Sequence, residues 1–170
     1  LSDPRRQVAM YDDGVGTSSF RPLKTLGGIF GIGLKRNILH LYRFLCEQYQ
    51  PGDRIYAFGF SRGAFTIRLL IGLIATEGIV WGVRDQAGNI RRAQGSDLDH
   101  LSRWAYRAFR RRFNTTGGLV GPLRNLRDWW LRRADRRAGR PAYADAVMLE
   151  VREATPADRP PFDKVPTDTR

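Results

Sequence analysis

The chain has 170 residues and a mass of 19.4 kDa, which is enough for one domain of ordinary size. Hydrophobic residues make up 42% of it and aromatic residues 11%, a composition that argues against wholesale disorder. The net charge of +12 favours a polyanionic partner, either nucleic acid or an anionic membrane surface. A single cysteine, Cys46, excludes an internal disulfide framework and a cysteine-rich zinc site.

The positive charge is concentrated in one stretch of the chain. Residues 84–140 contain 15 basic and 5 acidic residues, and all 15 basic residues are arginine. The sequence predicts no signal peptide and no membrane-spanning helix, because its most apolar run, Ile67 to Ala75, falls far short of the roughly 20 residues that a bilayer requires. Since the chain begins with Leu1 rather than Met, we expect a part of the protein to precede it.

The first two-fifths of the chain alternates between strand and helix patterns. A short apolar run at residues 8–11 predicts a buried strand, and apolar residues at helical spacing predict a helix from Leu34 to Tyr49. Residues 54–60 are rich in aromatic and apolar side chains without alternation, as in a strand covered on both faces, and residues 61–76 predict a buried helix. This order predicts βαβ units and a parallel α/β sheet.

Beyond Gly78 the pattern becomes helical and basic. A capping signal at Ser96 predicts a helix over residues 97–113, and Pro122 is placed to begin a second basic helix. Residues 146–151 predict a last strand, and residues 155–170 predict loop or disorder. We therefore divide the chain into an α/β core (1–83), a basic helical insertion or cap (84–140), and a strand with a loop or disordered tail (141–170).

The candidate catalytic motif spans Gly59 to Gly63 and has the form Gly-x-Ser-x-Gly. A strand that turns directly into a helix at Ser61 must strain its backbone there, and the flanking glycines remove side chains that would collide. The N–H of Arg62, at the start of the helix, is a candidate donor to an oxyanion. In the alternative interpretation, Ser61 is an N-cap and the glycines serve close packing.

The motif and its surroundings resemble the catalytic-domain family of type VI secretion phospholipase effectors, which also includes uncharacterised α/β hydrolases. The resemblance covers residues 7–80. It is carried by the stretch Ile55 to Arg68 with the preceding Pro51-Gly52-Asp53, and by Asn37, Gly27, Gly28, Gly31 and the run Tyr11-Asp12-Asp13-Gly14-Val15-Gly16-Thr17.

The resemblance implies an α/β-hydrolase fold and a serine esterase or lipase that cleaves phospholipid acyl esters through an acyl-enzyme on Ser61. It implies no cofactor and no metal. The family's first strand precedes the segment that opens this chain, and its acid and histidine motifs do not appear here. Residues 147–151 are the candidate for the acid-bearing strand, and Glu150 is not assigned as the acid. We therefore expect an incomplete catalytic domain that is inactive by itself.

The two histidines are weak candidates for the catalytic base. His40 lies on the polar stripe of its helix and precedes Ser61, whereas this fold places the histidine last. His100 follows Ser61 but shares a helix face with Arg103, Arg107 and Arg111, which disfavour the imidazolium that a general base must form. A solvated helix face is the preferred interpretation of both.

The arginine-rich segment has three interpretations. Aromatic and arginine side chains are interleaved in it, which suits stacking and phosphate contacts on nucleic acid. The same pattern suits helices lying on an anionic bilayer. The plainest interpretation is two solvated helices, and nucleic acid is the least favoured of the three.

The resemblance thus implies a phospholipase-like serine hydrolase made in the bacterial cytoplasm, and it leaves open whether the protein is then secreted by a route that needs no signal peptide. The alternative is a basic α/β module that binds nucleic acid or an anionic membrane without catalysis. The sequence makes no prediction of the oligomeric state.

Overall fold

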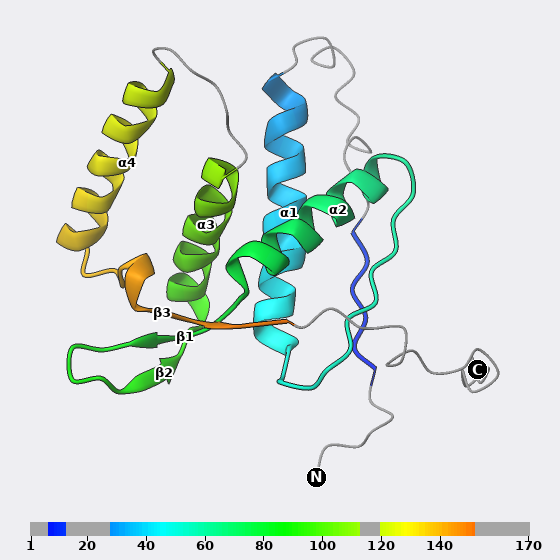
Figure 1. The fold of residues 1–170 in the computed structure, drawn as a ribbon, viewed down its shortest axis with the longest axis horizontal. Helices are drawn as coiled ribbons and strands as arrows, with labels where there is room; N and C mark the ends of the chain where they lie inside the picture. Colours follow the sequence, from blue (N-terminus) through cyan, green and yellow to red (C-terminus); the bar gives the residue numbers. More distant parts are fainter. Residues whose placement is uncertain (1–6, 13–27, 113–119, 152–170) are drawn as a thin grey trace.

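The computed structural model describes residues 7–12, 28–112 and 120–151. Helices make up most of this part of the chain. They are α1 (Gly28–Gln48), α2 (Arg62–Glu77), α3 (Gly95–Arg112), α4 (Val120–Arg137) and the short 3-10 helix η2 (Tyr143–Asp145). The first three α-helices pack on one another, with α2 crossing beside α1 and α3, while α4 lies on the far side of α3 (Figure 1).

A small antiparallel sheet lies at one end of the helices. Its strands, in the order β2-β1-β3, are β1 (Ile79–Arg84), β2 (Ile90–Arg92) and β3 (Ala146–Leu149). In register, Gly82 of β1 faces Arg92 of β2, and Val80 faces Met148 of β3. The pairing of β1 with β3 is irregular between Val80 and Gly82.

The predicted parallel sheet of an α/β hydrolase is wrong for this structure, because both pairings in the sheet are antiparallel. The predicted strands at residues 8–11 and 54–60 have no strand assignment. Aromatic and apolar composition favours an extended backbone, but a strand forms only when a neighbouring strand accepts and donates its backbone hydrogen bonds. Within the described ranges no strand pairs with either segment.

Several local predictions are confirmed. The helices expected at 61–76, at 97–113 and from Pro122 correspond to α2, α3 and α4, and the strand expected at 146–151 is β3. The first helix begins earlier than expected, at Gly28, so that the glycine-rich approach to Leu34 is itself helical. The predicted tail at 155–170 lies outside the described residues, and so do residues 114–119 of a loop expected at 114–121. The end of that loop prediction is wrong, because Val120 and Gly121 already belong to α4.

The hairpin of β1 and β2 was not predicted. Its turn has a recognisable signal, since Asp85 accepts a hydrogen bond from the backbone N–H of Asn89 at 2.8 Å and Gly88 has a φ of +88°. Gly78, at φ +80°, joins α2 to β1, and a Cβ there would lie 2.8 Å from the carbonyl oxygen of Leu149. Glycine is therefore required at position 78, between the end of helix α2 and the start of strand β1.

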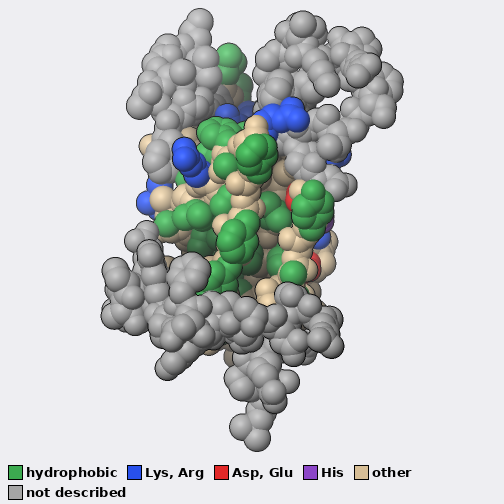
Figure 2. All heavy atoms as spheres, turned by 90° about the vertical axis from the view of Figure 1, so that its right-hand side faces the viewer, with side chains coloured by type: hydrophobic (Ala, Val, Ile, Leu, Met, Phe, Trp, Pro, Cys, Tyr) green, Lys and Arg blue, Asp and Glu red, His purple; other side chains and the backbone are tan. Residues whose placement is uncertain are grey.

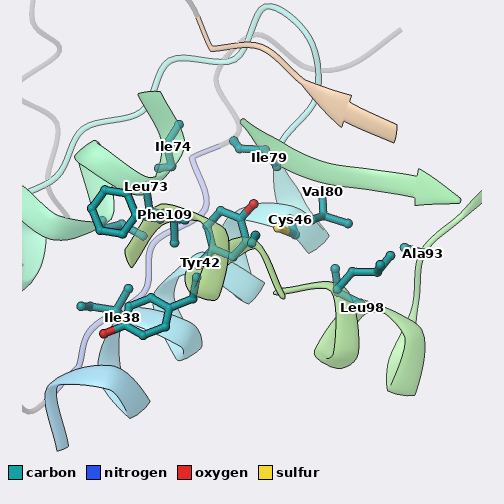
Figure 3. Close-up of a cluster of buried hydrophobic side chains, with 14 of the residues drawn as sticks. Ile38, Tyr42, Cys46, Leu73, Ile74, Ile79, Val80, Ala93, Leu98 and Phe109 are labelled. Carbon is teal, nitrogen blue, oxygen red and sulfur yellow. The ribbon is translucent and has the colours of Figure 1, made fainter. Parts of the chain in front are cut away.

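The hydrophobic core lies between α1, α2, α3 and β1 (Figure 3). Tyr42 is at its centre, fully buried, and its hydroxyl donates a hydrogen bond to the Gly78 carbonyl at 2.8 Å. Apolar side chains surround it from each element, and each full burial contributes about 1.5–3 kcal/mol. They include Ile38, Cys46, Leu73, Ile74, Ile79, Val80, Leu98, Leu101 and Phe109.

Helix α2 is less buried than expected. Its inward face consists of Thr66, Leu70, Leu73 and Ile74. On its other side two large apolar side chains, Phe65 and Ile71, are exposed. Apolar side chains of this helix therefore lie on its exposed face as well as on the face that packs in the core.

Helix α4 packs with its polar side inward. Asp128 is only 2% exposed and is hydrogen-bonded to Arg111 of α3 and to its own neighbour Arg127. In contrast, the apolar side chains Leu123, Leu126 and Trp130 face solvent. This orientation reverses the usual amphipathic arrangement of a surface helix.

The division of the chain at residues 83 and 140 stays a prediction. The core and the sheet both draw on residues from either side of residue 83, and β3 joins the sheet from beyond residue 140.

Of the helices in the described ranges, none combines the length and the hydropathy needed to cross a bilayer.

Candidate active site

Ser61 lies at the junction between segment 53–60, which has no regular secondary structure, and helix α2. Its backbone has φ 51° and ψ −117°, and among the described residues it is the only one other than glycine with a positive φ. Such a conformation costs on the order of 1–3 kcal/mol for a residue with a side chain. The conformation agrees with the strained turn that the Gly-x-Ser-x-Gly motif predicts.

Ser61 occupies the N-cap position of α2, but its side chain makes no capping hydrogen bond. Capping is the ordinary reason for a serine at this position, because the hydroxyl can accept a hydrogen bond from a free backbone N–H. The N-cap interpretation therefore lacks its usual hydrogen bond. The residue is exposed, so its hydroxyl is accessible to an external molecule.

The two glycines of the motif have different environments. A Cβ added at Gly59 would lie 2.6 Å from the carbonyl carbon and oxygen of Gly63 and 2.7 Å from the backbone nitrogen of Ala64. A Cβ at Gly63 would meet none of the described atoms within 4 Å. The prediction that close approach requires glycine is confirmed at Gly59, and the same steric argument is wrong for Gly63.

Backbone hydrogen bonds close the first turn of α2 around Ser61. Gly63 N–H donates to the Phe60 carbonyl at 2.8 Å, and Phe65 N–H donates to the Ser61 carbonyl at 3.4 Å. Arg62 is the first residue of the helix, a position whose N–H has no intrahelical acceptor. Together with the dipole of a 16-residue helix, this N–H favours negative charge next to Ser61.

The residues that precede Ser61 in the sequence include exposed aromatic side chains. Phe58 is 88% exposed, Phe60 is 93% exposed, and Tyr56 is also exposed. Figure 2 shows the face of the molecule on this side, where hydrophobic side chains gather at the centre and basic side chains lie in its upper part. An acyl chain bound near Ser61 would have apolar surface available to it.

Neither histidine contacts Ser61. The side chain of His40 is 63% exposed, and its Nδ1 lies 3.7 Å from Oδ2 of Asp12, so the predicted solvated position is correct for this residue. The side chain of His100 is only 10% exposed, with its Nε2 3.7 Å from Oδ2 of Asp135, so the predicted solvated face is wrong for His100. The burial of His100 follows from the docking of α4, whose Asp135 also accepts a hydrogen bond from Trp104 Nε1 at 3.1 Å.

The candidate acids also have defined positions. Glu150 follows the last residue of β3 and is exposed. Glu77, at the end of α2, was not singled out by its sequence, yet its Oε2 accepts a hydrogen bond from the Tyr143 hydroxyl at 2.8 Å and its Oε1 lies 3.0 Å from Nε of Arg112. Its role is to join α2, α3 and η2. No group of three metal-ligating side chains occurs within residues 7–12, 28–112 and 120–151.

The arginine-rich segment forms α3 and α4, and many of its charges are paired. Arg103 pairs with Asp99, Arg112 with Glu77, and Arg111 and Arg127 share Asp128. The aromatic residues of α3, namely Trp104, Tyr106 and Phe109, are buried and cannot serve as stacking surfaces, whereas Trp129 and Trp130 of α4 are exposed.

The sequence was compared with known proteins. The chain is 35% identical over 91 residues to "Uncharacterized protein YEL023C" of Saccharomyces cerevisiae, an alignment that covers 46% of the chain and 13% of the yeast protein. The chain thus spans only a small part of that relative. No solved structure matches it with significant similarity.

Residues 1–117 match the family described as "T6SS, Phospholipase effector Tle1-like, catalytic domain". The match includes Ser61 and its turn, and it continues through all of α3, beyond the residues whose resemblance was recognised by motif. The family is one of hydrolases that the type VI secretion system (T6SS) exports as effectors. Since the match covers more than half of its residues, the chain belongs to the Tle1-like catalytic-domain family of T6SS phospholipase effectors.

Proposed function

We propose that the protein is a serine ester hydrolase of phospholipids and that Ser61 is its nucleophile. The observation that carries the proposal is the backbone of Ser61, which is strained, exposed and uncapped at the start of α2. Strain in a polar residue persists where the surrounding structure enforces it, and such residues cluster at functional sites. The family's description as a phospholipase catalytic domain supports the choice of an ester substrate.

In the proposed reaction, Ser61 Oγ attacks the carbonyl carbon of an acyl ester. The carbonyl oxygen becomes negative, and the Arg62 N–H stabilises it by a hydrogen bond that strengthens as charge develops. Collapse of the tetrahedral intermediate expels the alcohol, which takes up a proton, and leaves the acyl group on Ser61. Water then attacks the acyl-enzyme and releases the fatty acid, restoring the serine hydroxyl.

The attack requires a base to accept the proton of Ser61. The imidazole of His40 lies beside Asp12, and that of His100 lies beside Asp135. Neither histidine contacts Ser61. We therefore expect residues 1–170 alone to hydrolyse short p-nitrophenyl esters no faster than the Ser61→Ala variant of the same chain. Turnover that depends on Ser61 would contradict this expectation, and its further loss in His100→Ala would identify His100 as the base.

Labelling with a fluorophosphonate probe tests the nucleophile in the full-length protein. We expect the probe to modify Ser61, and we expect Ser61→Ala to lose at least about 99% of phospholipid hydrolysis with unchanged circular dichroism, because removal of a triad member costs several orders of magnitude. Absence of labelling together with full activity in Ser61→Ala would exclude this role. It would favour the alternative function, a basic module that binds an anionic partner without catalysis.

We also propose that α4 associates with anionic membrane. Its outward stripe of Leu123, Leu126 and Trp130 lies among exposed arginines, an arrangement that suits a helix lying in the lipid interface. Replacing Leu126 and Trp130 with serine should weaken sedimentation with phosphatidylglycerol vesicles while leaving hydrolysis of a soluble ester unchanged in the full-length protein. Equal sedimentation of variant and wild type would contradict the proposal.

The family's export route requires no signal peptide, and we propose that the protein is made in the bacterial cytoplasm before export. A tagged copy should reach the culture medium from a strain with an active type VI apparatus and remain in the cells of a strain lacking it.

A further inference from the structure

A cavity of about 150 Å³ lies where α1, α3 and α4 meet, away from the turn that holds Ser61. Its lining contains five basic side chains and one carboxylate: Lys35, Arg107, Arg110, Arg111, Arg127 and Asp128. Lys35 comes from α1, so the cluster is assembled from three helices and is not a run of neighbours in the sequence. At about 30 Å³ for each water molecule, the cavity has room for about five waters or one tetrahedral oxyanion.

The single carboxylate is already engaged. Asp128 accepts hydrogen bonds from Arg111 and from Arg127, whose Nη2 lies 2.9 Å from Oδ1. Lys35, Arg107 and Arg110 form no ion pair with any acidic side chain in the described part of the chain. Arg107 instead lies over the ring of Trp104, 4.7 Å from its centroid.

The crowded positive charge shifts the pKa values of the cluster. Burial lowers the pKa of Lys35, and the charges of Arg107, Arg103, Arg110 and Arg127 lower it further. Burial also lowers the pKa of Arg107, although Asp128 opposes this change. Crowded cations that are partly desolvated gain more from an anion than the same cations would on an open surface.

The donor set is better suited to phosphate than to a carboxylate. Guanidinium groups offer paired N–H donors that match two oxygens of a phosphate, and an ammonium group adds a compact charge for a third. Tyr106 also lines the cavity, and burial raises the pKa of its hydroxyl, which therefore stays protonated as a further donor. A planar carboxylate would use only part of this set.

We propose that the cavity between α1, α3 and α4 binds a phosphate group, carried either by a soluble phosphoryl compound or by a phospholipid head group. The site is separate from the proposed chemistry at Ser61 and does not depend on it. Its binding is therefore measurable in the Ser61→Ala protein as well as in the wild type.

Thermal unfolding of the chain in chloride and in inorganic phosphate or pyrophosphate, at matched ionic strength, tests the proposal. A ligand that binds only the folded state raises Tm in a saturable way. We expect pyrophosphate to stabilise the wild type and Arg136→Gln, whose side chain is exposed on α4 outside the cavity. The double variant Lys35→Gln/Arg110→Gln should lose the shift, with a Kd raised at least about tenfold.

The double variant should unfold no earlier than the wild type in chloride alone, because it removes repulsion and breaks no ion pair of the described residues. An equal Tm shift in all three proteins, or no saturable shift in the wild type, would overturn the proposal. Loss of the shift in Arg136→Gln to the same degree would also overturn it, since binding would then follow net charge, as on a nucleic-acid or membrane surface.

Vesicles distinguish the two sources of phosphate. If the ligand is a lipid head group, phosphatidic acid in phosphatidylcholine vesicles should bind the wild type and Arg136→Gln more tightly than the double variant, and pyrophosphate should compete. If the ligand is soluble, pyrophosphate binding should depend on Lys35 and Arg110 while vesicle binding does not.

Discussion

At the scale of single residues, the turn at Ser61 depends on one glycine more than on the other. Gly59 faces the backbone of Gly63 and Ala64 so closely that any Cβ would overlap it, whereas Gly63 has open space on that side among the described atoms. Both glycines belong to the same motif, so sequence alone treats them as equivalent. Their different surroundings give a matched pair of substitutions.

We expect Gly59→Ala to displace the turn and Gly63→Ala to leave it intact. A Cβ at 2.6 Å from backbone atoms cannot be relieved by a side-chain rotation, so the backbone must shift, at a cost of about 1–3 kcal/mol in unfolding free energy. Urea unfolding of both variants measures the difference, and fluorophosphonate labelling in the full-length protein reports the position of Ser61. Equal stability and equal labelling of the two variants would contradict the geometry.

Cys46 is a second residue whose chemistry is set by its position. It is 2% exposed, and burial raises the pKa of its thiol to about 12. The thiolate is the reactive form, so we expect iodoacetamide at pH 8 to modify native Cys46 at least about a hundredfold more slowly than the thiol unfolded in urea. Modification at equal rates would show that the core around α1 opens readily.

The same shift predicts how stability depends on alkaline pH. Because the thiol ionises near pH 9 when unfolded and only near pH 12 when folded, its contribution is complete below pH 9 and is lost as the pH rises toward 12. The hydroxyl of Tyr42 adds to this effect, since burial raises its pKa as well. In Cys46→Ala the free energy of unfolding should fall less steeply between pH 9 and pH 12 than in the wild type. Urea titrations at successive pH values would measure this difference.

At the scale of elements, α4 is attached by polar contacts rather than by an apolar face. Asp128 reaches Arg111 of α3, and Asp135 accepts hydrogen bonds from Trp104 of α3 and from Arg140 beyond α4. Burial alone would raise the pKa of Asp128, but hydrogen bonds from Arg127 and Arg111, together with their charges, hold it below the usual value. The ionised carboxylate of Asp128 therefore stabilises the docking of α4.

We expect Asp128→Asn to destabilise the chain by about 1–3 kcal/mol, because it leaves Arg111 and Arg127 without their anion. A carboxylate whose pKa is lowered in the folded protein stabilises the fold above pH about 4. This contribution is lost as the pH falls through the pKa that the carboxylate has in the folded protein. The difference between wild type and variant should therefore shrink in acid. Asp145→Asn, at an exposed position in η2, is the control and should match the wild type throughout.

At the scale of the whole molecule, the segment 53–60 leaves a large apolar surface uncovered. Tyr56, Phe58 and Phe60 are all exposed, and Phe65 of α2 and Tyr11 add to the exposed aromatic side chains. Large exposed apolar side chains promote association between protein molecules when they gather on one surface. The extended backbone beside it also offers hydrogen-bonding groups that no strand of the described ranges uses.

We expect residues 1–170 to self-associate through this segment, and Tyr56→Ser/Phe58→Ser to reduce that association without loss of helical circular dichroism. Light scattering after size exclusion at increasing protein concentration would measure it. Ile90→Ser, which removes an exposed apolar side chain from β2, should behave as the wild type. If the double variant associates as strongly as the wild type, another surface is responsible.

The sequence by itself determined the features that depend on neighbours along the chain. Leu98, Leu101, Ala105, Ala108 and Phe109 recur at helical spacing, which located α3, because helical hydrogen bonds and side-chain periodicity are local. All of them except Ala108 are buried. The Gly-x-Ser-x-Gly pattern located the strained turn for the same reason, since it depends only on the residues from Gly59 to Ala64.

Only the tertiary structure decided which segments pair and which faces are covered. Residues 54–60 have the composition of a strand but remain unpaired, while Ile79–Arg84 becomes the central strand because Ile90–Arg92 and Ala146–Leu149 both reach it. The burial of His100 and the cavity beside Lys35 likewise depend on where α4 docks, because Asp135 lies against His100 and Arg127 lines the same cavity as Lys35. Strand pairing and helix docking join distant residues, and a local pattern contains no information about which distant partner will be present.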